Sequence, residues 1–399
     1  MAQVMAQVMA HVTILQAVPR LETGGSEQST VEIVQALTRA DASALVATEG
    51  GRMATAVREA GGEIIPLPMA SKNPLTILAN ARRLAKIVEE RNVTLIHARS
   101  RAPAWSAFLA ARRTMRPFVT TYHGAYSSRV PFKTLYSSVM ARGDRVIANS
   151  HYTAALIAAR HHVPQERMRV IYRGIDLSRF ESIAPARLEA LRAAWGVRKG
   201  QPIVLHAARL TSWKGQRYVI EAAQKMLAAN QLSDAVFILA GDDQGRDSYR
   251  NELEAQIQAA GLQDRVRLVG HCDDIPAAFA LAHVAVIASI SAETFGRTSI
   301  EAQAMGCPVI VTDVGAAPEN VIPASSSADF TGWVVPTADS AALAASLVEA
   351  LTLSPEARAA IGLRARAHVA GHFTLQEMQR ATLAVYDKLL GTDLAARSR

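Results

Sequence analysis

Two glutamates, Glu293 and Glu301, are separated by seven residues across an expected strand-to-helix turn. An apolar strand ends near Ser289, a polar loop carries Glu293, and a helix is expected from about Gly296 to Gly306. The first backbone N–H groups of a helix have no partner within it and can bind an anion. Because ligands of open α/β sheets bind at the carboxyl ends of the strands, we expect an anionic ligand here. Glu301 would accept hydrogen bonds from a ribose diol, and Glu293 would reach a sugar.

A pair of carboxylates at this spacing, taken alone, is more often part of a solvated helix face. The surrounding sequence favours the binding interpretation, because Phe-Gly lies between the two glutamates and Met-Gly-Cys-Pro with a further strand follows them. At the start of this helix, the residues that we expect to contact the bound ligand are Phe295, Gly296, Arg297 and Thr298.

The strands and helices that position these residues alternate along the chain, and this alternation occurs twice. In the first half, short apolar strands are expected at 12–18, 44–47, 63–66, 95–97, 118–122 and 145–148, with helical stretches such as 27–39 and 75–91 between them. The pattern restarts at 202–208, continues through a helix at 216–228 and strands at 236–240, 265–268, 284–288 and 309–312, and ends in a helix at 375–390. Alternating strands and helices predict parallel sheets covered by helices on both faces. A chain of 399 residues, half of them hydrophobic, supports two such domains.

With these motifs the chain resembles the nucleotide-sugar glycosyltransferases of family 4, whose hallmark is two glutamates seven residues apart, followed by a glycine-proline turn and a strand. The resemblance covers nearly the whole chain. It implies an α/β GT-B fold, in which two Rossmann-like domains of doubly wound parallel sheet face a central cleft and the last helix returns to the first domain. We expect an acceptor-binding domain at 1–180, joined by 375–399, and a nucleotide-sugar-binding domain at 181–374.

The resemblance also assigns two cations that follow the strand at 202–208. Arg209 and Lys214 match the family's positions that bind the donor diphosphate. Charge that develops on a leaving diphosphate must be stabilised by Arg, Lys or a metal ion. Because the sequence contains no Asp-x-Asp motif, we expect Arg209, Lys214 and the helix start to act in place of Mg²⁺, with no metal site and no cofactor. The alternative is a loop with two surface cations.

Two matches lie in the first half. Gly24 and Gly25 follow the first strand where a dinucleotide-binding protein would have Gly-x-Gly-x-x-Gly; that fingerprint is absent, and the pair would let backbone approach a diphosphate or acceptor. Alone it predicts only a tight turn. His123 ends the strand at 118–122, and the resemblance puts it beside the transferred sugar, although a lone histidine at a strand end is usually structural.

The reaction implied is retaining transfer from a uridine or guanosine diphosphate sugar, with His123, Glu293, Arg209 and Lys214 as the catalytic group. The loop at 270–275 does not distinguish uracil from guanine. Two other classes of function remain open on the same fold. One is a nucleotide-sugar 2-epimerase, which would act on the donor without an acceptor. The other is a non-catalytic nucleotide-binding subunit, in which we would expect other residue types to replace the glutamates or the lysine of these motifs.

The composition of the sequence limits the cellular compartment that we expect for the chain. No apolar run reaches the roughly 18 residues that a membrane-spanning helix needs. Cys272 and Cys307 are the only cysteines, which excludes a disulfide framework and a zinc cluster and favours a reducing cytoplasm. Residues 1–10 lack the basic start and apolar segment of a secretory signal; their repeated Met-Ala-Gln-Val resembles an ambiguous translation start, and we leave them out of the fold prediction.

Positive charge is concentrated in the first half, where residues 1–176 contain 22 lysines and arginines against 12 acidic residues. The nine basic residues from 99 to 145, against the single acid Asp144, are Arg99, Arg101, Arg112, Arg113, Arg116, Arg129, Lys133, Arg142 and Arg145. Nucleic-acid-binding motifs are absent, so we expect an anionic membrane surface or an acidic acceptor as the partner. A solvated helix face is the alternative. In the family, bacterial members often build lipopolysaccharide or other envelope glycans, which implies a glycan or lipid-linked acceptor and a peripheral position at the inner face of the membrane.

Overall fold

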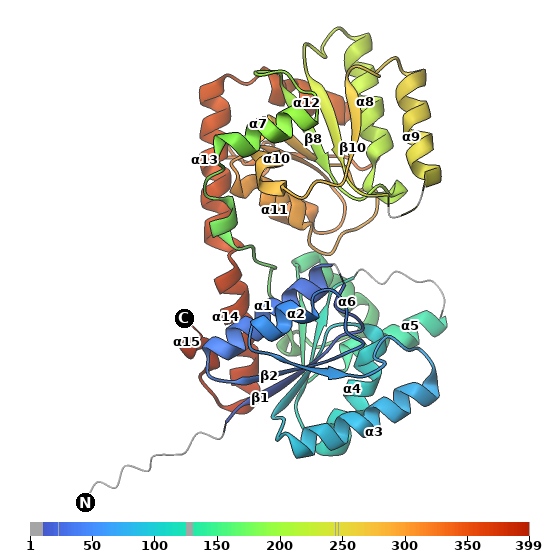
Figure 1. Cartoon of the computed structure of the whole chain (residues 1–399), viewed down its shortest axis with the longest axis vertical. Coiled ribbons are helices and arrows are strands. Elements are labelled where there is room, and N and C mark those ends of the chain that lie inside the picture. The colour runs from blue at the N-terminus through green and yellow to red at the C-terminus, as the bar shows by residue number, and fades with distance from the viewer. Residues whose placement is uncertain (1–10, 23, 125–130, 244, 246, 399) are drawn as a thin grey trace, which may run out of the picture. The chain divides into compact units, whose positions relative to one another are not determined.

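The computed structural model describes residues 11–22, 24–124, 131–243, 245 and 247–398, without the side chains of residues 131 and 132. The chain divides into two compact units. Unit 1 consists of Met1–Tyr172 and Gln376–Arg399, and unit 2 of Arg173–Leu375. Each unit is an α/β layer structure built on its own parallel sheet (Figure 1).

Unit 1 contains a seven-stranded sheet with the order β3-β2-β1-β4-β5-β6-β7, and all its strand pairs are parallel. Its strands are β1 (Thr13–Ala17), β2 (Ser43–Thr48), β3 (Glu63–Pro66), β4 (Leu95–Ala98), β5 (Phe118–Tyr122), β6 (Arg145–Ala148) and β7 (Met168–Val170). Its helices are α1 (Gly25–Arg39), α2 (Ala54–Glu59), α3 (Pro74–Glu90), α4 (Arg101–Thr114), α5 (Pro131–Ser137), α6 (His151–His161), α14 (Leu375–Leu390) and α15 (Leu394–Arg397), with 3-10 turns η1 (Ser138–Ala141) and η2 (Gln165–Arg167).

Unit 2 contains a six-stranded parallel sheet with the order β10-β9-β8-β11-β12-β13. Its strands are β8 (Ile203–Ala207), β9 (Val236–Ala240), β10 (Val266–Gly270), β11 (Val284–Ile287), β12 (Val309–Thr312) and β13 (Gly332–Val335). Its helices are α7 (Pro185–Ala194), α8 (Gln216–Ala228), α9 (Asp247–Ala259), α10 (Ile275–Leu281), α11 (Arg297–Ala304), α12 (Ser340–Thr352) and α13 (Pro355–His372), with 3-10 turns η3 (Leu177–Phe180), η4 (Ser212–Lys214) and η5 (Ala317–Asn320).

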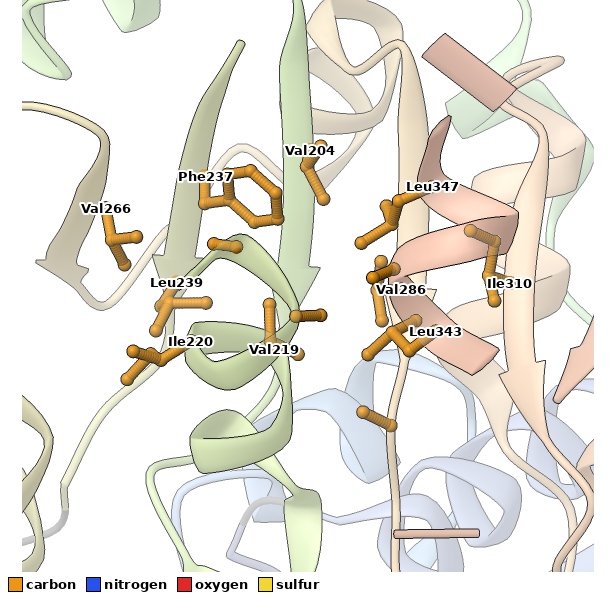
Figure 2. Close-up of a cluster of buried hydrophobic side chains, with 14 of the residues drawn as sticks. Val204, Val219, Ile220, Phe237, Leu239, Val266, Val286, Ile310, Leu343 and Leu347 are labelled. Carbon is orange, nitrogen blue, oxygen red and sulfur yellow. The ribbon is translucent and has the colours of Figure 1, made fainter. Parts of the chain in front are cut away.

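The core of unit 2 shows why its strands are continuous apolar runs. Val219 and Ile220 of α8, like Leu343 and Leu347 of α12, point toward one face of the sheet, where they meet strand residues such as Phe237 (Figure 2). The opposite side chains of the same strands are buried as well, because α10 and α11 belong to the other layer. A parallel sheet covered on both faces is expected to have this composition.

The last long helix belongs to unit 1, as the family resemblance implied. Gln379 of α14 donates from its Nε2 atom to the carbonyl of Glu32 in α1 at 2.6 Å. The hydroxyl of Tyr386 lies 2.6 Å from Nδ1 of His97, a fully buried histidine at the end of β4. The hydroxyl of Thr121 lies 2.7 Å from the other ring nitrogen of His97. These contacts bind α14 to the sheet of the first half of the chain.

All eleven expected strands are confirmed, several to the residue, and two strands, β7 and β13, were missed. β7 is a three-residue edge strand that is only partly buried, so it lacks a strong apolar pattern. β13 begins with a glycine after a polar loop, so its apolar run is too short to indicate a strand. Among the described helices, none is both long and apolar enough to span a bilayer.

Candidate functional site

The candidate site lies at the carboxyl edge of the sheet in unit 2, where three neighbouring strands end. In the order β8-β11-β12, the loop after β8 carries Arg209 and Lys214, and the loop after β11 carries Glu293. The loop after β12 supports the loop of Glu293 by a main-chain contact described below. Parallel strands bring the residues that follow them to one edge, which is where α/β folds bind ligands.

Lys214 and Glu293 form an ion pair across two of these loops. Lys214 Nζ lies 2.8 Å from Glu293 Oε1, and the two side chains are only 13% and 15% exposed. The Ser289 hydroxyl donates to the same carboxylate oxygen. The Lys214 ammonium also lies 4.4 Å from the ring centre of Trp213. The sequence assigned Lys214 to the diphosphate and Glu293 to the sugar, and the structure brings their side chains into direct contact.

Main-chain hydrogen bonds connect the three loops around this ion pair. The amide of Ile290 donates to the carbonyl of Trp213 at 2.8 Å, which links the loops after β11 and β8. The amide of Ala316, after β12, donates to the carbonyl of Glu293 at 2.9 Å. Gly215 ends η4 with φ near 80°, and a Cβ there would lie 1.8 Å from the carbonyl oxygen of Ala288. Only glycine permits this approach of the Lys214 loop to the end of β11.

A buried histidine lies beneath the ion pair. His206 is on β8, and its Nδ1 atom lies 2.8 Å from the carbonyl oxygen of Val286 on β11. Burial lowers the pKa of His206 to about 4, and the charges of Lys214 and Glu293 act on it in opposite directions. The ring is therefore neutral at physiological pH and joins the two strands that carry the ion pair.

The start of α11 is open to an anion. α11 begins at Arg297 after Gly296, which has φ near 84°, and no side chain caps the helix. Asn320 is fully buried and donates from Nδ2 to the carbonyls of Phe295 and Gly296, the latter at 3.1 Å. These bonds hold the turn in place, so the first amides of the helix are fixed at the edge of the sheet.

Glu301 is one turn into α11 and is paired with Arg297. Arg297 Nε lies 2.9 Å from Glu301 Oε1, and the side chains are 25% and 21% exposed. Burial raises the pKa of the Glu301 carboxyl, while the charges of Arg297 and Arg179 oppose this rise. Phe295 is buried, with its ring centre 5.9 Å from that of Phe373, whereas Thr298 is half-buried beside Arg297.

Arg209 differs from Lys214 because its charge is exposed. Its carbonyl oxygen accepts a hydrogen bond of 2.8 Å from Gln216 Nε2, which fixes the main chain. In the part of the chain that the structure describes, no acidic group forms an ion pair with the Arg209 guanidinium. The edge therefore presents one exposed cation beside one cation that is already paired.

The three candidate residues of unit 1 follow strand ends of its own sheet. Gly24 precedes α1, which starts at Gly25, two residues earlier than expected. Thr23, the residue before this glycine pair, is outside the described residues. A Cβ on Gly24 would lie 2.5 Å from Glu27 Oε2, because that carboxylate folds back over the helix start. His123 directly follows β5 and is half-buried.

The basic stretch at 99–145 does not form one exposed surface, which corrects part of the sequence interpretation. Arg99 is only 3% exposed and donates from Nε to Gln16 Oε1 at 2.8 Å. Its position directly after β4 buries it under α1 and α14. Arg129 lies outside the described residues. The exposed members are Arg112, Arg113, Arg116, Lys133 and Arg142, with Arg101 and Arg145 half-buried.

Sequence reasoning missed Ser289, His206 and Asn320 as parts of this site. His206 and Asn320 act through partners that are distant in the chain, Val286 at 80 residues and Gly296 at 24 residues, whereas the partner of Ser289 is Glu293, four residues further on. Their only sequence signal was a polar residue inside or directly after an apolar strand or turn.

Two family models match the chain. The model for glycosyl transferases group 1 matches residues 188–368, and the model for Glycosyltransferase Family 4 matches residues 23–179. Among curated proteins, the lipopolysaccharide core biosynthesis mannosyltransferase LpsB of Rhizobium meliloti is 30% identical over 253 residues, covering 63% of this chain and 68% of that protein.

Solved structures are similar over almost the whole length. A glycosyltransferase from Rickettsia africae has 32% identity and a TM-score of 0.87, covering 96% of this chain and 100% of that one. HepE of Anabaena in complex with UDP and glucose has 25% identity and a TM-score of 0.80, covering 95% and 100%.

The neutral state of His206 predicts a pH dependence of stability. A histidine in the unfolded chain titrates near 6.5, so between pH 6.5 and about 4 the unfolded state binds a proton that the native state excludes. The free energy of unfolding should fall as the pH falls through this window, by up to roughly 3 kcal/mol from this residue. In His206→Gln that part of the slope should be lost.

Urea unfolding at several pH values, followed by tryptophan fluorescence, measures this slope, since three of the four tryptophans lie in unit 2. Thr312→Val, which removes a buried hydroxyl of β12 and no titratable group, is the control and should keep the wild-type slope. If the free energy of unfolding has the same pH dependence in His206→Gln and in wild type, the conclusion that His206 is neutral in the folded protein is wrong.

Proposed function

This chain belongs to the group 1 glycosyltransferases and has their GT-B fold, and from this premise we propose that it is a retaining, metal-independent enzyme. It transfers a sugar from a uridine or guanosine diphosphate sugar to a glycan or lipid-linked acceptor. We place this reaction in envelope polysaccharide or lipopolysaccharide synthesis, with the enzyme peripheral at the inner face of the membrane. The name of the Rhizobium relative and the UDP and glucose in the Anabaena structure support this proposal.

The observation that carries the proposal is the arrangement at the edge of the sheet in unit 2. The Lys214–Glu293 ion pair lies where the loops after β8 and β11 meet, in the same loop system as the uncapped start of α11 and the exposed charge of Arg209. Two cations and a helix start are what a diphosphate requires. A carboxylate beside them suits the hydroxyl groups of the attached sugar.

The ion pair gives Lys214 a partner that a bound diphosphate can replace. In this proposal the phosphate oxygens take up the Lys214 ammonium, and Glu293 turns its carboxylate to the sugar hydroxyls. Arg209 already faces solvent and needs no partner exchange. Glu301 accepts hydrogen bonds from the ribose diol, in place of the one it now accepts from Arg297 Nε.

In the transfer step, the bond between the anomeric carbon and the phosphate oxygen breaks, and the electron pair goes to the leaving diphosphate. The acceptor hydroxyl oxygen bonds to the anomeric carbon on the same face, and its proton goes to the departing phosphate oxygen. Arg209, Lys214 and the amides at the start of α11 stabilise the negative charge that develops. His123 hydrogen-bonds the sugar, and the backbone at Gly24 and Gly25 contacts the diphosphate or the acceptor.

Replacing Lys214 by alanine should lower kcat by about a hundredfold or more, because one preorganised charge next to the leaving group is lost. Turnover of the wild type should persist in EDTA. The assay measures nucleoside diphosphate release from a panel of uridine and guanosine diphosphate sugars with candidate acceptors.

Lys225→Ala, at an exposed lysine on α8 of the same unit, is the matched control and should keep wild-type turnover. Thermal unfolding of each variant separates a loss of chemistry from a loss of the folded state. Near-normal turnover in Lys214→Ala, or complete loss of wild-type turnover in EDTA, would rule out the proposed role of the cations.

Glu301→Gln keeps the side-chain shape but removes its charge, so it should weaken nucleoside diphosphate binding by about tenfold. Calorimetry with UDP and GDP measures this change. Glu293→Gln should reduce turnover more than nucleotide affinity, since Glu293 is assigned to the sugar. If nucleotide affinity is unchanged in Glu301→Gln, the ribose assignment is wrong.

A further inference from the structure

Unit 1 has an apolar groove that none of the proposed donor-site or catalytic residues enters. The groove has a volume of about 320 Å³ and lies where α3, α4 and α5 meet; its lining residues are Lys72, Pro74, Ile77, Leu78, Trp105 and Tyr136. Figure 1 shows these three helices gathered at one side of the unit. The indole N–H of Trp105 donates to the carbonyl of Tyr136 at 3.0 Å, which ties α4 to α5 at the groove.

Large apolar side chains are exposed on the same helices. Leu75 and Leu78, three residues apart on the first turns of α3, are 76% and 49% exposed. Leu135, the neighbour of Tyr136 on α5, is 58% exposed. Single exposed leucines are ordinary on a protein surface, but several beside an apolar groove mark an interaction site.

A row of arginines stacked on aromatic rings extends from the groove. The Arg101 guanidinium carbon lies 5.8 Å from the ring centre of Tyr136, and that of Arg142 lies 5.1 Å from the ring centre of Trp105. Arg142 and Arg112 lie 5.5 Å and 5.3 Å from the ring centre of Phe108. Rings and charges alternate along this row, so each apolar surface has a cation beside it.

Positive charge predominates in the segment that forms this face. Residues 64–145 contain 14 lysines and arginines against three acids, Glu89 and Glu90 at the C-terminal end of α3 and Asp144. The Asp144 carboxylate accepts a hydrogen bond of 2.8 Å from the amide of Phe118 and lies 4.0 Å from Arg112. Lys72 lines the groove, and Lys133 is exposed on α5. The ligand that complements this face is therefore both apolar and anionic.

We propose that this face of unit 1 docks on an anionic lipid bilayer, with Leu75, Leu78 and Leu135 inserted among the lipids. The proposal rests on the proposed function, in which the acceptor is lipid-linked and presented at a membrane. A bilayer interface offers acyl chains and negative headgroups side by side, and binding there depends on buried apolar area together with electrostatic attraction. Trp105 and Tyr136 are residue types that favour this boundary. The basic residues stacked on the rings contact the headgroups.

This docking differs from attraction by charge alone. Binding through arginines such as Arg113 and Arg116 would disappear when salt screens the headgroups. Inserted leucines would leave a part of the binding that salt does not remove and that depends on the apolar side chains.

Vesicle sedimentation with the full chain tests the proposal, using phosphatidylcholine vesicles with and without phosphatidylglycerol. The double variant Leu75→Glu, Leu78→Glu should bind the anionic vesicles about tenfold or more weakly than wild type. Leu363→Glu, at a leucine of α13 in unit 2 that is 67% exposed, is the matched control and should bind like wild type. Leu135→Glu should weaken binding independently.

Three results would overturn the proposal. One is wild-type binding by the double variant. Another is equal wild-type binding to vesicles with and without phosphatidylglycerol. The third is failure of the wild type to bind anionic vesicles; sedimentation velocity would then show whether the leucines instead hold two copies together. UDP and GDP binding is measured in the same samples, so that a failure of the proposed function is recognised separately from a failure of docking.

Discussion

The ion pair between Lys214 and Glu293 is the interaction on which the candidate site depends. Two opposite charges with little exposure to water are stable only while each has the other, since removing one leaves a charge that is costly to bury. The pair therefore fixes the separation of two loops that are 79 residues apart in the chain. It also keeps a cation and a carboxylate close together at the place where a diphosphate and its sugar would be bound.

The supports of this pair are neutral and buried. His206 joins β8 to β11 below the pair, and Asn320 holds the turn before α11. Gly215 lets the loop of Lys214 approach the end of β11 more closely than any other residue would. Because these supports are buried and hydrogen-bonded, the main chain that carries the charges is held at the edge before a ligand binds, and in the proposed reaction only the side-chain partners change.

Local patterns in the sequence predicted most of the fold. Apolar runs such as Phe118–Tyr122 coincide with strands, and the family resemblance predicted that the helix at 375–390 would belong to the first domain. The sequence also pointed to the loops that meet at the edge of unit 2. It did not predict the pairing of Lys214 with Glu293 or the burial of Arg99, because both depend on partners brought together by the folded sheets. The assignment of Gly24, Gly25 and His123 to a substrate stays a prediction.

The most direct test of the account is the anomeric configuration of the sugar released or transferred from an α-linked nucleotide sugar. Proton NMR during turnover distinguishes the first-formed anomer before it equilibrates in water. Retaining transfer keeps the α configuration of the donor, because the acceptor oxygen attacks on the face from which the diphosphate leaves. A first-formed product of β configuration would contradict it, since that outcome requires attack from the opposite face.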